Sequence, residues 1–184
     1  MAIIHRDGNI TPTKRELATA WLDRQGLGAG DVEMLGAYRF DDPAGKVGIE
    51  GHLVRRGGEV FHLAMTYRDA PCDGAGAHLL ATMEHSVLGR RWVYAAEGDP
   101  VALACYAAAL AGRQEQASLE VWEGGAPVGQ QRPNTVTLTA EGDGPAGGGV
   151  RLYRVPGDPA GSAAAGRRLV AAWDGGARVV AVSV

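Results

Sequence analysis

The sequence predicts an α+β protein in which a curved antiparallel sheet packs on helices and a small β-rich segment follows. Apolar residues recur at helical spacing in two stretches, residues 12–25 and residues 101–111. Between these stretches, runs of alternating polar and apolar residues are separated by turn sequences, which is the pattern of an antiparallel meander. The apolar face of such a sheet needs a cover, and a helix is the simplest one.

The chain is expected to begin with a short strand at residues 2–5, followed by the helix at residues 12–25. Thr13 and Glu16 have the spacing of a capping box, and Pro12 suits the first helical turn. The apolar positions of this helix share one face: Leu17, Ala18, Trp21 and Leu22.

Three strands of a meander are predicted next, at residues 32–40, 46–56 and 59–68. Gly57-Gly58 is a hairpin signal between the second and the third. The third strand alternates throughout, so His62 and Ala64 are expected on one face and Phe61 and Leu63 on the other.

The stretch 82–100 separates the meander from the second helix. Residues 78–83 and 90–94 are expected to extend the sheet on either side of a turn at Gly89. Asp99 can cap the helix at residues 101–111, and Pro100 fits its first position. That helix is apolar nearly all round, which predicts deep burial.

The composition changes near residue 113, where Gly- and Pro-rich connections begin to separate short strands. We therefore predict two parts, residues 1–112 and a β-rich segment at residues 113–184. Its expected strands are 118–122, 135–140, 150–155, 167–173 and 178–184. Residues 141–149 and 156–166 have the composition of flexible linkers.

Composition excludes several classes of function. The 184 residues carry a formal net charge of −3, which gives no basic footprint for nucleic acid or an anionic membrane. No apolar run approaches the roughly 20 residues that span a bilayer, and the N-terminus lacks a signal-peptide pattern, so we expect a cytoplasmic protein. Cys72 and Cys105 cannot form a zinc site by themselves, and we expect neither metal nor cofactor.

Two segments imitate kinase motifs without their chemistry. His5-Arg6-Asp7 spells a catalytic-loop tripeptide, but the Asn that binds metal would fall at Pro12. A phosphate-covering loop at residues 142–149 would need a lysine on the following strand, and the last lysine of the chain is Lys46. We therefore expect a non-catalytic protein, with a cryptic enzyme as the less favoured alternative.

The best candidates for contact with a partner or ligand are Glu84, His85, Arg90 and Arg91, which lie on both sides of Gly89. Two arginines beside a turn can bind an anion or a partner's carboxylates. The alternative is internal, with Glu84 pairing with an arginine across the turn while Trp92 and Tyr94 enter the core.

His52 and His62 are weaker candidates. They lie on adjacent predicted strands and could approach one another, although no local metal-ligand spacing supports them. The alternative is that both are ordinary polar positions on a sheet face. Together with Glu84, Arg90 and Arg91 they could line the concave side of a curled sheet and form a ligand pocket.

Three stretches together resemble one family. They are MAIIHRDGNITPTKRELATAWL at residues 1–22, GAYRFDDPAGKVGIE at residues 36–50, and residues 66–100 with TYRDAP and MEHSVLGRRWVY followed by GDP. They resemble the N-terminal cap of maltokinases and related sugar kinases with an aminoglycoside-phosphotransferase-like body, over about residues 1–112. The resemblance implies a cystatin-like curved sheet with helices.

In that family, ATP-dependent sugar phosphorylation takes place in later lobes, and no position of this chain matches their lysine, aspartate or metal ligands. The resemblance therefore implies a stand-alone, cap-like module for protein interaction or regulation. Its expected partner is a sugar-kinase body or a second copy of the chain. The alternative is a protein that binds a sugar or a sugar phosphate.

Overall fold

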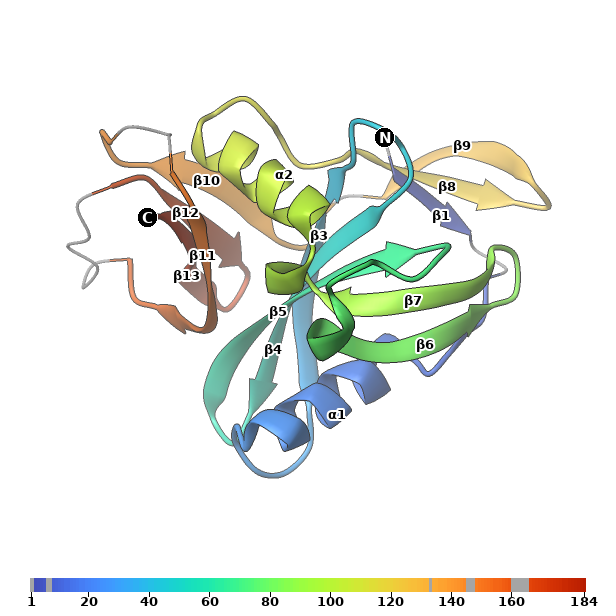
Figure 1. Ribbon diagram of the computed structural model, residues 1–184, viewed down its shortest axis with the longest axis horizontal. Helices are drawn as coiled ribbons and strands as arrows, with labels where there is room; N and C mark the ends of the chain where they lie inside the picture. The colour runs from blue at the N-terminus through green and yellow to red at the C-terminus, as the bar shows by residue number, and fades with distance from the viewer. Residues whose placement is uncertain (1, 6–7, 133, 145–147, 160–165) are drawn as a thin grey trace.

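The computed structural model describes residues 2–5, 8–132, 134–144, 148–159 and 166–184 (Figure 1). The predicted α+β class is confirmed, and strands make up most of the regular structure. Parts of three segments discussed above, His5-Arg6-Asp7, residues 141–149 and residues 156–166, lie outside the described residues.

A curled, antiparallel six-stranded sheet lies at the centre of the molecule, with the strand order β2-β6-β7-β5-β4-β3. Its strands are β2 (Ile10–Thr11), β3 (Glu33–Asp41), β4 (Gly48–Arg56), β5 (Glu59–Arg68), β6 (Leu79–His85) and β7 (Gly89–Ala95). The meander β3–β4–β5 and the β6–β7 hairpin were predicted from the sequence, whereas the two-residue edge strand β2 was not.

Helix α1 (Lys14–Gln25) covers one face of this sheet, as Figure 1 shows. Its capping box is confirmed: Thr13 Oγ1 accepts a hydrogen bond from the Glu16 N–H at 3.3 Å, and Glu16 Oε2 accepts one from the Thr13 N–H at 2.7 Å. Because Thr13 is the N-cap, Pro12 precedes the helix instead of lying in its first turn. The predicted apolar face packs against Val54, Phe61, Leu63, Met65, Met83 and Val93.

Helix α2 (Pro100–Leu110) packs on the opposite face of the sheet. Asp99 caps it by accepting a hydrogen bond from the Val101 N–H at 3.0 Å, and Pro100 occupies its first position, as predicted. Short 3-10 helices, η1 (Gly76–His78) and η2 (Ala96–Gly98), flank β6 and β7. No helix in the described part of the chain has the length and hydropathy needed to cross a membrane.

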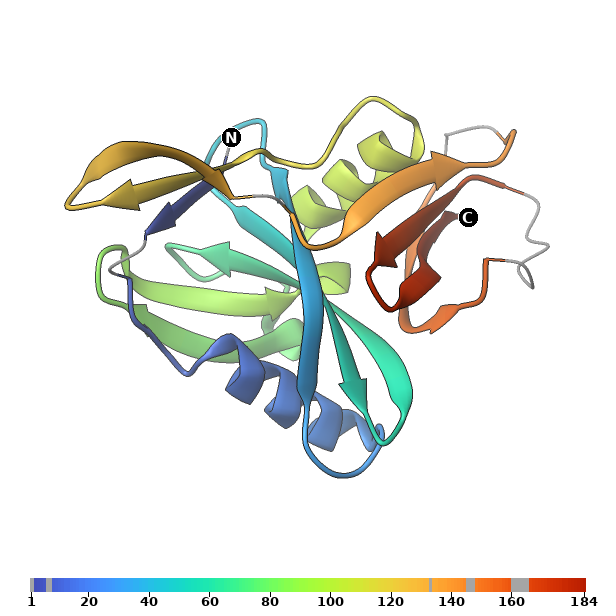
Figure 2. The same ribbon diagram turned by 180° about the vertical axis from the view of Figure 1, so that it is seen from behind.

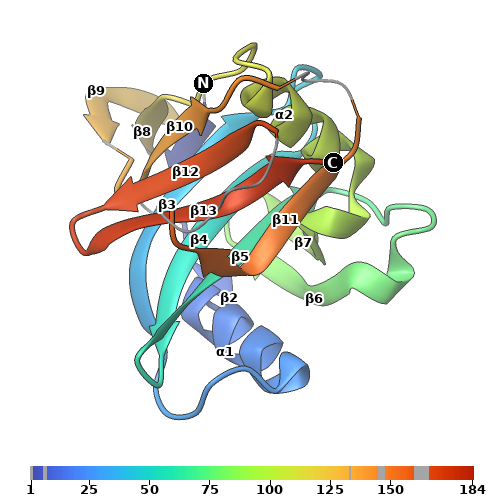
Figure 3. The ribbon, with the colours of Figure 1, turned by 90° about the vertical axis from the view of Figure 1, so that its left-hand side faces the viewer.

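The end of the chain forms an antiparallel four-stranded sheet with the order β10-β12-β13-β11 (Figure 3). Its strands are β10 (Thr137–Glu141), β11 (Val150–Gly157), β12 (Arg168–Trp173) and β13 (Gly176–Ser183). Leu169 and Val180 of this sheet share one hydrophobic core with Leu53 of β4 and Tyr106 of α2. The division at residue 112 stays a prediction, and this core spans both of its sides.

A smaller sheet combines β1 (Ala2–His5), β8 (Leu119–Glu123) and β9 (Ala126–Arg132), seen from behind in Figure 2. β1 pairs in parallel with β8, so the start of the chain is tied to the segment after α2. We did not predict β9, because its flanking glycines and Pro127 indicated an irregular connection.

Candidate partner-binding site

The β6–β7 hairpin carries the four residues predicted to contact a partner. Glu84 and Arg90 are cross-strand neighbours, and Arg90 Nε donates a hydrogen bond to Glu84 Oε1 at 2.8 Å. The pairing considered as an alternative therefore exists, but it lies on the surface, with both side chains about three-fifths exposed. An exposed pair of this kind contributes little to stability, so both groups can exchange partners at low cost.

His85 fixes the shape of the turn at the end of the hairpin. Its Nδ1 accepts hydrogen bonds from the backbone N–H groups of Val87 at 3.1 Å and Leu88 at 3.2 Å. Nδ1 must be unprotonated to accept both bonds. His85 thus shapes the turn through Nδ1, and its contact with a partner stays a prediction.

The turn is also hydrogen-bonded to the segment that precedes α1. The Asn9 N–H donates to Ser86 Oγ, and the Ser86 N–H donates to the Asn9 carbonyl oxygen, each at 3.0 Å. Gly89 closes the turn with a φ of 72°, a conformation that glycine adopts without strain. The two bonds to Asn9 thus hold the start of the turn, and Gly89 allows the chain to reverse at its end.

Arg91 is half-buried and faces the opposite side of the hairpin from Arg90, because adjacent strand residues alternate. Its Nη1 donates to the Arg90 carbonyl oxygen at 2.9 Å. Beyond these positions, Tyr94 is buried as predicted, whereas Trp92 is only half-buried.

His62 of β5 is buried where β5 meets β11 of the C-terminal sheet. Its Nδ1 is 3.2 Å from the Tyr153 carbonyl oxygen, and its Nε2 is 2.7 Å from the Tyr38 hydroxyl. Since a carbonyl can only accept, Nδ1 carries the proton and Nε2 accepts from Tyr38. The Tyr38 oxygen can then accept from the Tyr106 hydroxyl, 2.7 Å away.

Burial keeps this histidine neutral. Desolvation lowers the pKa of His62 to about 4, although the Tyr153 carbonyl and the Glu97 carboxylate oppose the shift. Burial likewise raises the pKa of Tyr106, and raises that of Tyr38 well above its usual range. The chain of hydrogen bonds is therefore uncharged near neutral pH and connects β5, β3, α2 and β11.

His52 belongs to a different cluster, on the α1 face of the sheet. Its Nε2 lies 3.1 Å from Glu50 Oε2, which also accepts a hydrogen bond from the Tyr67 hydroxyl at 3.0 Å. Lys14 Nζ donates to Glu50 Oε1 at 2.6 Å. Burial alone would raise the pKa of Glu50, but Lys14, His52 and Arg39 together hold it well below its usual range.

The ligand pocket predicted from the sequence, lined by the two histidines and the hairpin residues, does not form. His52 pairs with Leu63 and His62 with Leu53 across β4 and β5, which places the two histidines on opposite faces of the sheet. Glu84, Arg90 and Arg91 lie on the hairpin, away from both. The side chains of His52 and His62 therefore do not meet. Each lies on one face of the sheet, as the alternative interpretation expected, and each is nearly fully buried.

A shallow groove of about 540 Å³ lies elsewhere, beside β3, β10 and the β12–β13 turn. It is lined by Leu35, Asn134, Thr135, Thr137, Ala172, Trp173 and Asp174, none of which was a predicted site residue. Among the described residues, no group of three or more His, Cys, Asp or Glu side chains is placed to hold a metal ion.

One ion pair with a fully buried carboxylate was not predicted from the sequence. Arg68 makes two hydrogen bonds to the fully buried Asp99, from Nε at 2.7 Å and from Nη2 at 2.6 Å. Burial would raise the pKa of Asp99, but Arg68, Thr66 and the Val101 N–H bring it below its usual value. The signal available was that both residues occur in the stretches TYRDAP and GDP that carry the family resemblance.

These features define a class of protein: a mostly β module whose central sheet is covered on both faces and whose β6–β7 hairpin carries exposed charged side chains. Residues 17–99, from α1 to the N-cap of α2, match the family model of the maltokinase N-terminal cap domain. The match confirms the resemblance inferred from the sequence over that segment. Neither the curated proteins nor the solved structures contain a match to the chain, so the cystatin-like outline stays a prediction.

Proposed function

We propose that this chain is a non-catalytic, cap-like module that binds a partner protein through the β6–β7 hairpin. The observation that carries the proposal is the match of residues 17–99 to a maltokinase cap domain, since a cap is a non-catalytic part of that enzyme. The partner class that this match favours is a sugar-kinase body. A second copy of the chain is the alternative.

The fold supports the choice of the hairpin. One face of the six-stranded sheet is covered by α1, and the other by α2 and the four-stranded sheet. The hairpin stays accessible, with Glu84 and Arg90 exposed beside Arg91. Charged residues of this kind steer association and set specificity at the rim of an interface.

The test is a comparison of the tagged chain with a hairpin variant in lysate of the source cells. We expect the wild-type chain to retain one partner through high-stringency washing, and Glu84→Arg with Arg90→Glu and Arg91→Glu to lose it. Sedimentation velocity of the purified chain distinguishes a partner protein from self-association. A monomeric chain that retains no protein would rule the proposal out.

A thermal-shift screen with sugars, sugar phosphates and nucleotides tests the ligand-binding alternative. The partner proposal expects no specific response. A saturable increase in melting temperature with one sugar or sugar phosphate would instead favour a small-molecule binding protein.

A further inference from the structure

The end of the β6–β7 hairpin exposes two adjacent apolar side chains. Val87 is 51 % exposed and Leu88 is 44 % exposed. Tight turns in hairpins normally use Asn, Asp, Gly or Ser, which water solvates well. Single exposed apolar residues are common on protein surfaces, but an adjacent pair at a turn is a candidate contact surface.

Two neighbouring polar residues, His85 and Ser86, hold this apolar pair in place. His85 accepts from the N–H groups of both Val87 and Leu88. Ser86, next to them, is bonded twice to Asn9. A turn held in this way loses little conformational freedom on binding, and therefore more of the contact energy remains for affinity.

The hairpin carries an excess of positive charge in an acidic chain. Arg90 and Arg91 lie on opposite faces beside the turn, and Glu84 is the acidic residue between Leu79 and Ala95. The whole chain has a formal net charge of −3. A surface that complements the hairpin therefore combines an apolar depression with carboxylates at its edge.

We propose that Val87 and Leu88 insert into an apolar pocket of the partner protein whose rim carries Asp or Glu side chains. Arg91 and the outer side of Arg90 contact that rim, while His85, Ser86 and Gly89 hold the turn in its binding shape. This inference rests on the proposed function and names the residues and the partner chemistry that would carry it.

The test uses the full chain with a photo-reactive amino acid at position 88 or, as a matched control, at position 155. Val155 on β11 is 52 % exposed, like Val87, but belongs to the four-stranded sheet. We expect position 88 to crosslink to a partner peptide containing bulky apolar and acidic residues, and position 155 to give no such adduct. Adducts at basic or purely polar peptides would overturn the inference.

The second measurement is the affinity of the chain for the partner that the crosslinking identifies, purified on its own. We expect Val87→Asp with Leu88→Asp to raise the Kd at least about ten-fold, as loss of a central apolar contact does. Val155→Asp should leave the Kd unchanged. Arg91→Glu should raise the Kd, and the increase should be larger at low ionic strength than at high ionic strength. Circular dichroism of each variant shows that the fold is retained.

The outcomes separate the two proposals. If the partner binds the wild-type chain and the Asp double variant equally well, the inference about the hairpin tip fails while the partner-binding function stands. If no complex forms at all, both fail. Position 88 could instead crosslink to a second copy of the chain, in the groove lined by Leu35 and Trp173. That result would show that the partner is the chain itself and not a different protein.

Discussion

Two arginine–carboxylate pairs of similar length have different consequences in this protein, because their burial differs. Arg68 and Asp99 approach to 2.6 Å, with the Asp99 side chain inaccessible to solvent. Arg90 and Glu84 approach to 2.8 Å on the surface. In the buried pair, loss of one partner leaves a charge that water cannot solvate, whereas the surface pair is screened by solvent.

The first prediction concerns this contrast. Arg68→Ala should lower the free energy of unfolding by about 3 kcal/mol, because it leaves the Asp99 carboxylate buried without its cation. Arg90→Ala, the matched control, should change it little. Chemical denaturation of the three proteins measures both effects. Equal losses in the two variants would contradict the distinction.

The second prediction is a dependence of stability on pH through His62. Its pKa is about 4 in the folded protein, against about 6.5 for an unperturbed histidine. Between these pH values the unfolded chain binds more protons than the folded protein does. The contribution of neutral His62 to the free energy of unfolding is therefore complete above about pH 6.5 and is lost as the pH falls towards 4. The loss should be on the order of 3 kcal/mol.

The comparison with His62→Gln isolates this contribution. Both proteins contain the same buried carboxylates, which also titrate at acidic pH, so only the difference between their unfolding free energies reports His62. We expect that difference to change steadily between pH 6.5 and pH 4. Parallel curves over this range would show that His62 does not titrate as the structure implies.

At the level of single elements, local sequence signals predicted most of the fold. The capping box of α1, the Asp99-Pro100 start of α2 and the alternation of β5 each depend on residues close in sequence. The Arg68–Asp99 pair was not predictable in this way, because it joins the end of β5 to the start of α2. The shared core with the C-terminal sheet is also a long-range contact.

The positions of the two histidines could have been predicted. With Gly57-Gly58 as a two-residue turn, Arg56 pairs with Glu59, and the register continues to His52 opposite Leu63. Directly opposed residues share a face, so His62, one position away, must face the other side. In the β6–β7 hairpin, the charged residues could be singled out from the sequence. Their hydrogen bonds to one another and the exposure of Val87 could be seen only in the structure.

The third prediction tests the capping box at the level of the helix. Thr13→Ala removes the N-cap side chain and should lower the free energy of unfolding by about 1 kcal/mol. The same substitution at Thr19, inside α1, should be neutral or slightly stabilising, because Thr19 Oγ1 only bonds back to the Arg15 carbonyl and Ala is the better helix former. A loss at position 19 as large as that at position 13 would contradict this account of the helix start.

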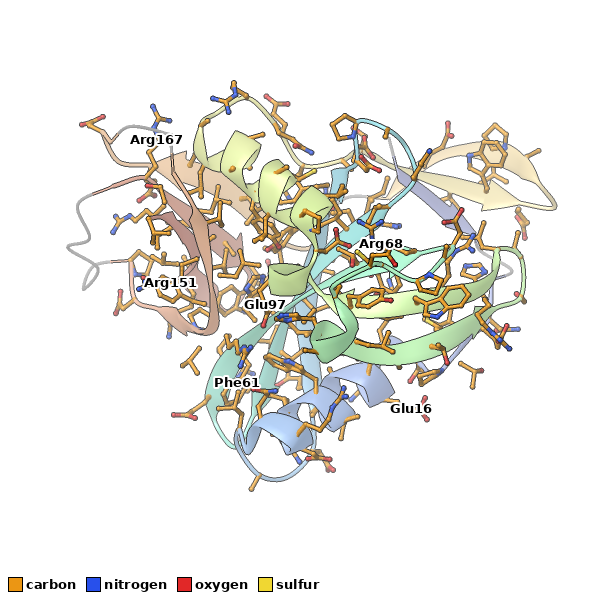
Figure 4. The ribbon with its side chains drawn as sticks, viewed as in Figure 1. Glu16, Phe61, Arg68, Glu97, Arg151 and Arg167 are labelled. Carbon is orange, nitrogen blue, oxygen red and sulfur yellow. The ribbon has the colours of Figure 1, made fainter. Side chains whose placement is uncertain are left out.

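At the scale of the whole molecule, the segment matched by the cap family does not enclose its own core. Leu169, Ala171, Val180 and Ala181 of the C-terminal sheet are buried against Tyr38, Leu53 and Ala64. Polar contacts cross the same junction. Arg154 of β11 reaches Glu97 at 2.6 Å and Gln25 at 2.7 Å, and Glu97 lies between the four-stranded sheet and α1 in Figure 4.

Arg167 adds a further connection, since its Nη1 donates to the Leu110 carbonyl oxygen at the end of α2. A cation at a helix C-terminus is favourable, because the last carbonyls are unsatisfied and the helix dipole is negative there. The shared hydrophobic core, the hydrogen bonds of Arg154 and the contact of Arg167 with the end of α2 thus connect the residues on both sides of position 112. We therefore expect the chain to unfold as one cooperative unit.

The fourth prediction follows from this shared core. The full chain should unfold in a single transition by calorimetry, whereas a chain ending at residue 112 should lack a cooperative transition, because it exposes Tyr38, Leu53 and Ala64 and loses the β8 partner of β1. Leu169→Ala in the full chain should cost about 2–5 kcal/mol. It should also accelerate hydrogen exchange in β4 and β5, not only in β12. Two separate transitions, or a sharp transition of the shortened chain, would show that the matched segment and the C-terminal sheet fold independently.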